Sequence, residues 1–118
     1  MNNKVIVIGI NPSSARKSMS ITRLVKWMDH LGVKYFSFSN CIPCTGKYTI
    51  NDVDFNNVAK YTHGYNKVFA LGNFPSQVLK KIGVEHHVLP HPSGLNRKLN
   101  DREYTMLQLE LARNYLEM

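Results

Sequence analysis

The stretch KVIVIGINPSS, residues 4–14, decides the fold class of this chain. Its β-branched run, residues 5–8, is typical of a strand that is buried on both faces of a parallel sheet. Gly9 and Pro12 end that run in a turn, because glycine permits a tight exit from the strand and proline stiffens the loop. A buried strand closed by such a turn indicates a sheet with helices on both of its faces.

Strand and helix patterns alternate along the rest of the sequence. Apolar residues at helical spacing predict helices over residues 21–31, 51–61, 73–82 and 100–115. Runs of β-branched and aromatic residues predict further strands over residues 33–39, 67–71 and 84–89. This alternation implies βαβ units, so we expect a single domain over residues 1–118, an α/β fold in which a four-stranded parallel sheet lies in a three-layer α/β/α sandwich.

The last helix carries two specific predictions. Asn100 is expected to cap its N-terminus, with Glu103 three residues later at the spacing of a capping box. One stripe of the helix is expected to face the core, and it consists of Tyr104, Leu107, Leu111 and Tyr115.

Composition limits the class of protein. The 118 residues are 43% hydrophobic and 19% charged, which predicts a compact core and argues against a disordered chain. No apolar run approaches the roughly 18 residues of a membrane span, and residues 5–8 are too short for a signal-peptide core. We therefore expect an intracellular, cytoplasmic protein without a membrane partner. The net charge of +7 favours a polyanionic partner such as nucleic acid.

The cysteines and histidines do not form a recognisable metal motif. Cys41 and Cys44 are a single pair, and the histidines are not spaced as the ligands of a zinc module. A redox role is disfavoured because Pro43 and Gly46 predict an irregular loop instead of the helix start that lowers a thiol pKa. We expect no metal and no cofactor, and we interpret His86 and His87 as structural residues on opposite faces of a strand.

The segments that follow the predicted strands are the candidate functional loops, since ligands of open parallel sheets bind at the carboxyl ends of the strands. After the first strand the turn presents Asn11, whose amide can both donate and accept hydrogen bonds. The second strand delivers Asn40 to a loop rich in turn formers. After the fourth strand, Pro90 and Pro92 flank His91 in a stiff loop that can grip a phosphate.

Together these loops resemble the motifs of the uracil-DNA glycosylase superfamily. Residues 9–12, Gly-Ile-Asn-Pro, are similar to the first motif of its mismatch-specific and single-strand-selective branches. Residues 91–97, His-Pro-Ser-Gly-Leu-Asn-Arg, are similar to the second motif. Residues 36–43 resemble the segment where several branches place a base-reading Asn, and residues 68–73 resemble the third central strand. The resemblance spans nearly the whole chain.

The resemblance implies a role for each matching residue. Asn11 would position the hydrolytic water, and His91 would stabilise the negative charge that grows on the departing base. Base binding would fall to Asn40, Ile10 and Phe38. The residues implied in DNA contact are Pro12, Ser13, Ser93, Gly94, Leu95, Asn96 and Arg97, with Leu95 as the wedge that replaces the extruded base and Arg97 as a backbone anchor.

The implied activity is hydrolysis of the N-glycosidic bond of uracil or another modified pyrimidine in single-stranded or mismatched DNA, as in base-excision repair. Two other hypotheses stay open. One is a glycosylase-fold module without catalysis that binds nucleic acid or a protein. The other is hydrolysis or transfer at the glycosidic bond of a free nucleoside or nucleotide. The sequence leaves the target base and the oligomeric state undetermined.

Overall fold

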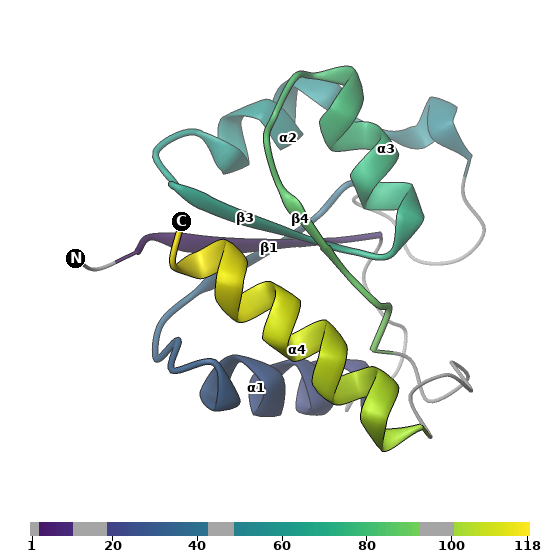
Figure 1. Ribbon diagram of the computed structural model, residues 1–118. Coiled ribbons are helices and arrows are strands. Elements are labelled where there is room, and N and C mark those ends of the chain that lie inside the picture. The colour runs from purple at the N-terminus through teal and green to yellow at the C-terminus, as the bar shows by residue number, and fades with distance from the viewer. Residues whose placement is uncertain (1–2, 11–18, 43–48, 93–100) are drawn as a thin grey trace.

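The computed structural model describes residues 3–10, 19–42, 49–92 and 101–118, in which strands alternate with helices (Figure 1). The strands are β1 (Val5–Gly9), β2 (Ser37–Asn40), β3 (Lys67–Leu71) and β4 (His87–Leu89). The helices are α1 (Met19–His30), α2 (Phe55–Thr62), α3 (Asn73–Lys81) and α4 (Arg102–Leu116), and a 3-10 turn at Ile50–Asp52 precedes α2. The predicted α/β class with a four-stranded parallel sheet is confirmed.

The sheet has the strand order β2-β1-β3-β4, and all three pairings are parallel. Its centre is the β1–β3 pair, in which Ile6 lies opposite Val68 and Ile8 opposite Ala70. Every residue of these two strands is buried, as the β-branched run of β1 predicted. The chain leaves β1 toward β2 on one side and leaves β3 toward β4 on the other, so the topological switch point lies between β1 and β3.

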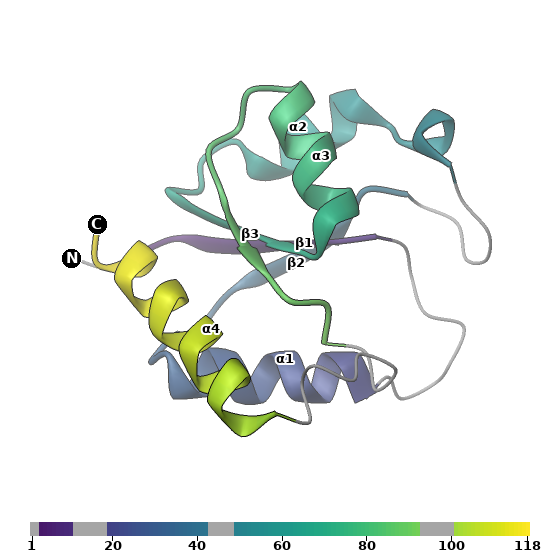
Figure 2. The ribbon, with the colours of Figure 1, turned by 45° about the vertical axis from the view of Figure 1, so that its right-hand side comes forward.

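Helices cover both faces of the sheet, with α1 and α4 on one face and α2 and α3 on the other (Figure 1, Figure 2). Alternate residues of each central strand point to opposite faces, which gives two separate cores. The core under α1 and α4 contains Val5, Val7, Phe69, Leu71, Leu89, Leu24, Trp27, Met28, Leu31, Leu109, Ala112 and Tyr115. The core under α2 and α3 contains Ile6, Ile8, Val68, Ala70, Cys41, Ile42, Val53, Val58, Val78 and Leu79.

The second predicted helix begins at Phe55 instead of residue 51, and the fourth predicted strand begins at His87 instead of residue 84. Three further details of the predicted elements are wrong. The second strand begins at Ser37 instead of residue 33, because Val33 and Phe36 pack against the core before strand pairing starts. The N-cap of α4 is Asp101 instead of Asn100, since the Asp101 carboxylate accepts hydrogen bonds from the backbone N–H groups of Glu103 and Tyr104.

The predicted core stripe of α4 is the third error. Of the predicted stripe, Tyr115 is buried and Tyr104 is half-buried, but Leu107 is 56% exposed and Leu111 is 43% exposed. Leu109 and Ala112 are buried beside Tyr115 instead. Leucines occur on more than one face of this helix, so apolar spacing alone allowed two stripes. Burial against the sheet selects the stripe that contains Ala112.

The phenol of Tyr115 completes the hydrogen bonding of β3. Gly72 N–H points toward β4 and donates to Leu89 O at 2.8 Å, so Val68 N–H, four residues earlier, points to the same side. The paired part of β4 begins opposite Phe69, and Val68 N–H donates instead to the Tyr115 hydroxyl at 3.0 Å. A side chain of α4 therefore takes the place of a missing strand residue.

None of the helices in the described ranges has the length and apolar character to span a bilayer.

Candidate functional site

The carboxyl ends of the four strands form one edge of the sheet, and this edge holds the candidate site. Pairing between β1 and β2 continues past the strands, because Cys41 N–H donates to Gly9 O at 3.0 Å and Ile42 N–H donates to Ile10 O at 2.9 Å. Ile10, predicted to contact the base, therefore lies at this edge and is half-buried. These bonds fix the exit of β1 beside the end of β2, and the other side of β1 borders the switch point with β3, where open α/β sheets bind their ligands.

Two side chains of β2 lean over Gly9. A Cβ atom at Gly9 would lie 2.8 Å from Asn40 Oδ1 and 2.9 Å from Phe38 Cζ, which is closer than van der Waals contact allows. Gly9 is therefore needed here for the close approach of its neighbours and not for backbone freedom. Asn40 is half-buried, and Phe38 is 37% exposed, so part of the ring is open to a ligand. Both predicted base-binding residues of β2 thus meet at the end of β1.

His91 occupies the other side of the switch point. It follows β4 by two residues and lies against Gly72, where a Cβ atom would be 3.6 Å from His91 Cβ. Gly72 has a φ of 91°, a conformation that favours glycine, and it begins α3 as its N-cap. Burial lowers the pKa of His91 below its usual 6.5, so the imidazole is neutral at pH 7. A neutral imidazole has one N–H donor and one acceptor nitrogen.

The described structure thus brings four predicted residues to one edge, namely Ile10, Phe38, Asn40 and His91. The other predicted site residues lie outside the described residues: Asn11, Pro12, Ser13, Ser93, Gly94, Leu95, Asn96 and Arg97. Asn40 lies beside the end of β1, and His91 lies against Gly72 just after β3, so the two side chains come from the outer strands toward the two sides of the switch point.

A small pocket of about 210 Å³ adjoins Asn40 between β2 and α2. It adds three polar residues that the sequence analysis did not single out, Asp54, Asn57 and Tyr61. The Asp54 carboxylate caps α2 by accepting from Asn57 N–H at 3.1 Å, and it also accepts from the Asn57 side-chain amide at 2.8 Å. The sequence pattern that indicates this cap is Asp-x-x-Asn at the start of a helix. A helix predicted to begin at residue 51 places Asp54 inside the helix and so hides the pattern.

Cys41 and the histidines form no metal site in the described part of the chain. Cys41 is buried in the core under α2 and α3, and burial raises the pKa of its thiol to about 12, so the thiol stays protonated at neutral pH. Cys44 lies outside the described residues. Among residues 3–10, 19–42, 49–92 and 101–118, no three His, Cys, Asp or Glu side chains come together as metal ligands.

His86 and His87 are directed to opposite faces, as predicted. His86 Nε2 is 2.8 Å from Ser76 Oγ on α3, and His86 Nδ1 is 2.8 Å from Val84 O. His87 stacks on Tyr115 of α4, with ring centroids 5.4 Å apart. Both side chains thus contact the helices that cover the sheet, as their structural interpretation requires.

The chain matches no known protein-family model and no curated protein sequence. The chemistry of the site therefore has to be argued from its own groups. These are one amide that can donate and accept, one aromatic ring that is partly exposed, and one neutral imidazole, all at the switch point. Such a set can hold a planar heterocycle by its edge and its face, and it can place a hydrogen-bond donor at one of the heterocycle's oxygen atoms.

Proposed function

We propose that this protein hydrolyses the N-glycosidic bond of uracil or another modified pyrimidine in single-stranded or mismatched DNA. The observation that supports the proposal most is the convergence of Asn40, Phe38 and His91 on the β1–β3 switch point. The net charge of +7 suits a polyanionic substrate. The resemblance of residues 9–12 and 91–97 to glycosylase motifs supplies the reaction type.

In the proposed reaction each described residue acts on the extruded base. Asn40 pairs with the hydrogen-bonding edge of the pyrimidine, and the exposed part of the Phe38 ring stacks on it, an interaction worth about 1–3 kcal/mol per base. The bond from C1′ to the base nitrogen breaks with both electrons passing to the base. A water molecule adds to C1′ and loses one proton, and the released base anion takes up a proton in its place. His91 donates a hydrogen bond to the base oxygen where that negative charge collects. The resemblance assigns the positioning of the water to Asn11.

The direct test is cleavage of labelled oligonucleotides in the presence of a chelator. Single-stranded, matched and mismatched substrates, each with one uracil or modified pyrimidine, are incubated with the protein, and alkali then cuts the abasic sites. We expect cleavage of the single-stranded or mismatched substrate, where extrusion of the base costs least. Asn11→Ala is expected to abolish it.

Variants of His91 and Asn40 test the described half of the site. His91→Gln should lower kcat by about 10²–10³, the usual cost of one lost donor to a developing anion. His63→Gln is the matched control, because His63 is an exposed residue at the end of α2. Asn40→Ala should also lose activity, whereas Asn56→Ala, at an exposed position of α2, should not.

The pH profile tests the protonation state of the imidazole. Because burial holds the pKa of His91 below 6.5, the neutral form prevails throughout the range above it. We expect the rate to stay level between about pH 7 and pH 9, without the tenfold loss per pH unit that a required imidazolium would cause.

Gly9→Ala probes the geometry without removing a functional group. The added methyl would force Asn40 and Phe38 to move, while the backbone of β1 has no positive φ to strain. Activity should fall with little change in stability. Gly64→Ala is the complementary control, since Gly64 has a φ of 89° and open space around it, so strain of about 1 kcal/mol should leave activity unchanged.

Two outcomes would replace the proposal by one of its alternatives. If no base is excised but single-stranded DNA still binds with steep salt dependence, the chain is a binding module. If free nucleosides are hydrolysed and oligonucleotides are not, the substrate is a small molecule.

A further inference from the structure

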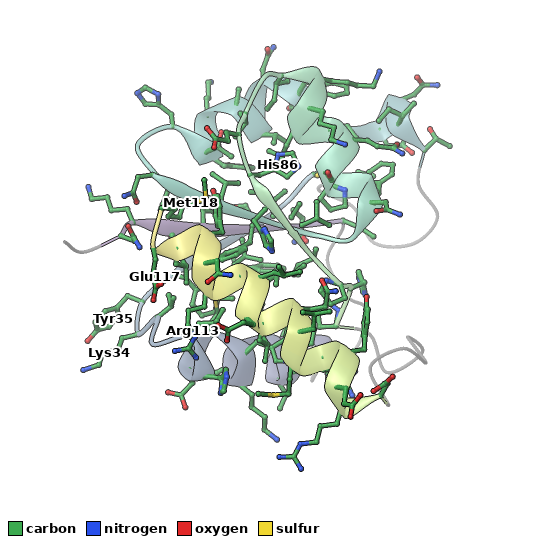
Figure 3. All side chains as sticks on the ribbon, in the orientation of Figure 1. Lys34, Tyr35, His86, Arg113, Glu117 and Met118 are labelled. Atoms are coloured by element: carbon green, nitrogen blue, oxygen red, sulfur yellow. The ribbon has the colours of Figure 1, made fainter. Side chains whose placement is uncertain are left out.

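A second cavity lies at the opposite end of the sheet from the candidate site. It measures about 870 Å³ and is formed where β1 begins, where α1 connects to β2, and where α4 ends. Figure 3 shows Lys34, Tyr35, Arg113 and Glu117 gathered at this end of the molecule, at the C-terminal ends of α1 and α4. We call it the amino-edge cavity. Its volume lies within the range of small-molecule sites, roughly 300–1,000 Å³.

The floor of the amino-edge cavity is apolar. It consists of Val5 and Leu31, which are buried, and of Val33 and Leu116, which are half-buried and pack against the same core. These residues belong to three separate segments that the sheet and its two helices hold in place. The floor is therefore a preformed apolar surface and not a gap between mobile side chains.

Two cations stand over this floor. Arg113 donates from Nη2 to His30 O at 3.2 Å, which fixes the guanidinium beside the last turn of α1 and leaves further N–H donors. Lys34 is exposed and lines the same cavity. Within the described residues neither side chain forms an ion pair, and Glu117 is the one acidic side chain in the lining. Met118 O, also in the lining, accepts a hydrogen bond from Lys67 Nζ at 3.1 Å. The side chains of the lining therefore carry two positive charges and one negative charge, and their N–H donors suit an anion.

Tyr35 adds an aromatic ring to the rim. It is 88% exposed, which is unusual for a side chain that is largely apolar, and it follows Lys34 directly. An exposed ring beside a cation and above an apolar floor offers a stacking surface to a planar ligand.

We infer that the amino-edge cavity binds a small ligand that combines a planar apolar body with an anionic group. The apolar body packs between Tyr35 and the floor, and the anionic group is bound by Lys34 and Arg113. The site is independent of the proposed glycosylase activity, because it lies at the other end of the strands and shares no residue with the carboxyl edge.

Amide chemical-shift titrations of the labelled full chain test this inference with three probes. Phenyl phosphate carries both the ring and the anion, inorganic phosphate carries the anion alone, and benzyl alcohol carries the ring alone. Phenyl phosphate should cause saturable shifts at Leu31, Val33 and Leu116 with a Kd below about 1 mM. The other two probes should bind at least about fivefold more weakly, and the amides of Ile10 and Gly72 should not respond.

Charge variants sharpen the test because they are expected to act in opposite directions. Lys34→Gln should weaken phenyl phosphate about fivefold, and Arg113→Gln should weaken it at least as much. Glu117→Gln should tighten binding about twofold, since it removes a repulsive charge. Lys81→Gln and Glu110→Gln remove the same charges from exposed positions that do not line the cavity, and they should change nothing.

Several results would overturn the inference. They are the absence of saturable shifts, equal binding of inorganic phosphate, shifts confined to the carboxyl edge, and an equal response of the lining and control variants. Arg113→Gln also removes the bond to His30 O, so Lys34→Gln, which removes no such contact, decides the result if the Arg113 variant unfolds.

Discussion

The two faces of the sheet differ in the hydrogen bonding of the neighbouring histidines His86 and His87. On the face under α2 and α3, His86 uses both ring nitrogens, one with Ser76 Oγ and one with Val84 O. On the face under α1 and α4, His87 contacts the rings of Phe69 and Tyr115, which also contact each other, and its Nε2 is buried without a hydrogen-bond partner among the described residues. Among the described residues, both ring nitrogens of the histidine on one face have hydrogen-bond partners, whereas burial favours the neutral form of the histidine on the other face.

This difference indicates that the two cores contribute to stability in different ways. The core under α2 and α3 is mainly aliphatic, so its contribution follows the apolar area that it buries. The core under α1 and α4 adds a chain of specific contacts, from Lys67 over the Tyr115 ring to the Tyr115 hydroxyl on Val68 N–H. Variants on each face can separate packing from specific contacts.

The largest effect is expected from the aliphatic core. Leu79 on α3 is fully buried, so Leu79→Ala removes several apolar contacts and leaves a cavity. Denaturant unfolding should show a loss of about 2–5 kcal/mol. A loss below about 1 kcal/mol would mean that this face repacks freely and that the contrast between the two cores does not hold.

The next effect concerns the hydroxyl of Tyr115. Tyr115→Phe leaves Val68 N–H buried without its acceptor, which should cost about 1–3 kcal/mol. Tyr65→Phe is the comparison on the other face, where the Tyr65 hydroxyl lies 2.6 Å from Ser37 Oγ at the edge strand. That loss should be smaller, because neither group is fully buried and water can replace the partner. Equal losses in denaturant unfolding would contradict the special role of Tyr115.

A pH-dependent effect should follow from His87. Burial, reinforced by the neighbouring His86, lowers the pKa of His87 below 6.5, so the unfolded chain binds the proton more readily than the folded one. The stability contributed by the neutral ring is complete above pH 6.5 and is lost as the pH falls from there through the lowered pKa.

His87→Phe keeps a ring against Tyr115 but cannot be protonated. The difference in unfolding free energy between the variant and the natural chain should therefore be constant above pH 6.5 and should grow in favour of the variant below it. His63→Gln, at an exposed position, serves as the comparison and should not reproduce this acid-side change. Parallel curves for His87→Phe and the natural chain would exclude His87 as the cause.

The smallest effect is expected on the outer surface of α4. Leu107 is 56% exposed, so Leu107→Gln should change stability by no more than about 0.5 kcal/mol. Leu109→Gln, only two residues away but buried in the core, should be strongly destabilising. Thermal unfolding of the pair distinguishes the observed stripe of α4 from the one that the sequence predicted.

The sequence predicted the central elements better than the marginal ones. The range 67–71 was predicted and found for β3, because a strand buried on both faces leaves an uninterrupted apolar run. The predicted start of β2 and the predicted buried face of α4 were wrong. The first depends on where β2 begins to pair with β1, and the second depends on which residues of α4 the sheet covers. Such boundaries depend on tertiary contacts that residue spacing does not encode.

The sequence likewise predicted which residues of the site follow strands, but not the contacts between them. Asn40 and His91 were singled out because they follow strands, and the structure places both at the carboxyl edge. The close approach of Phe38 to Gly9 was not foreseen, because it depends on the register of β1 against β2. The polar pocket beside Asn40 was missed because it requires α2 to begin at Phe55.

The bond between Tyr115 and Val68 also bears on the order in which a ribosome delivers this chain. The contact beside the central strand pair β1–β3 joins Lys4 to Asn66, 62 residues later in the chain. The backbone N–H of Val68 then needs the hydroxyl of Tyr115, a further 47 residues along. Vectorial synthesis therefore exposes β1 for a long interval before its central partner emerges. Burial of the sheet under α1 and α4 is completed only after Tyr115 has left the exit tunnel, so a nascent chain that has just released β3 still presents Phe69 and Leu71 to chaperones.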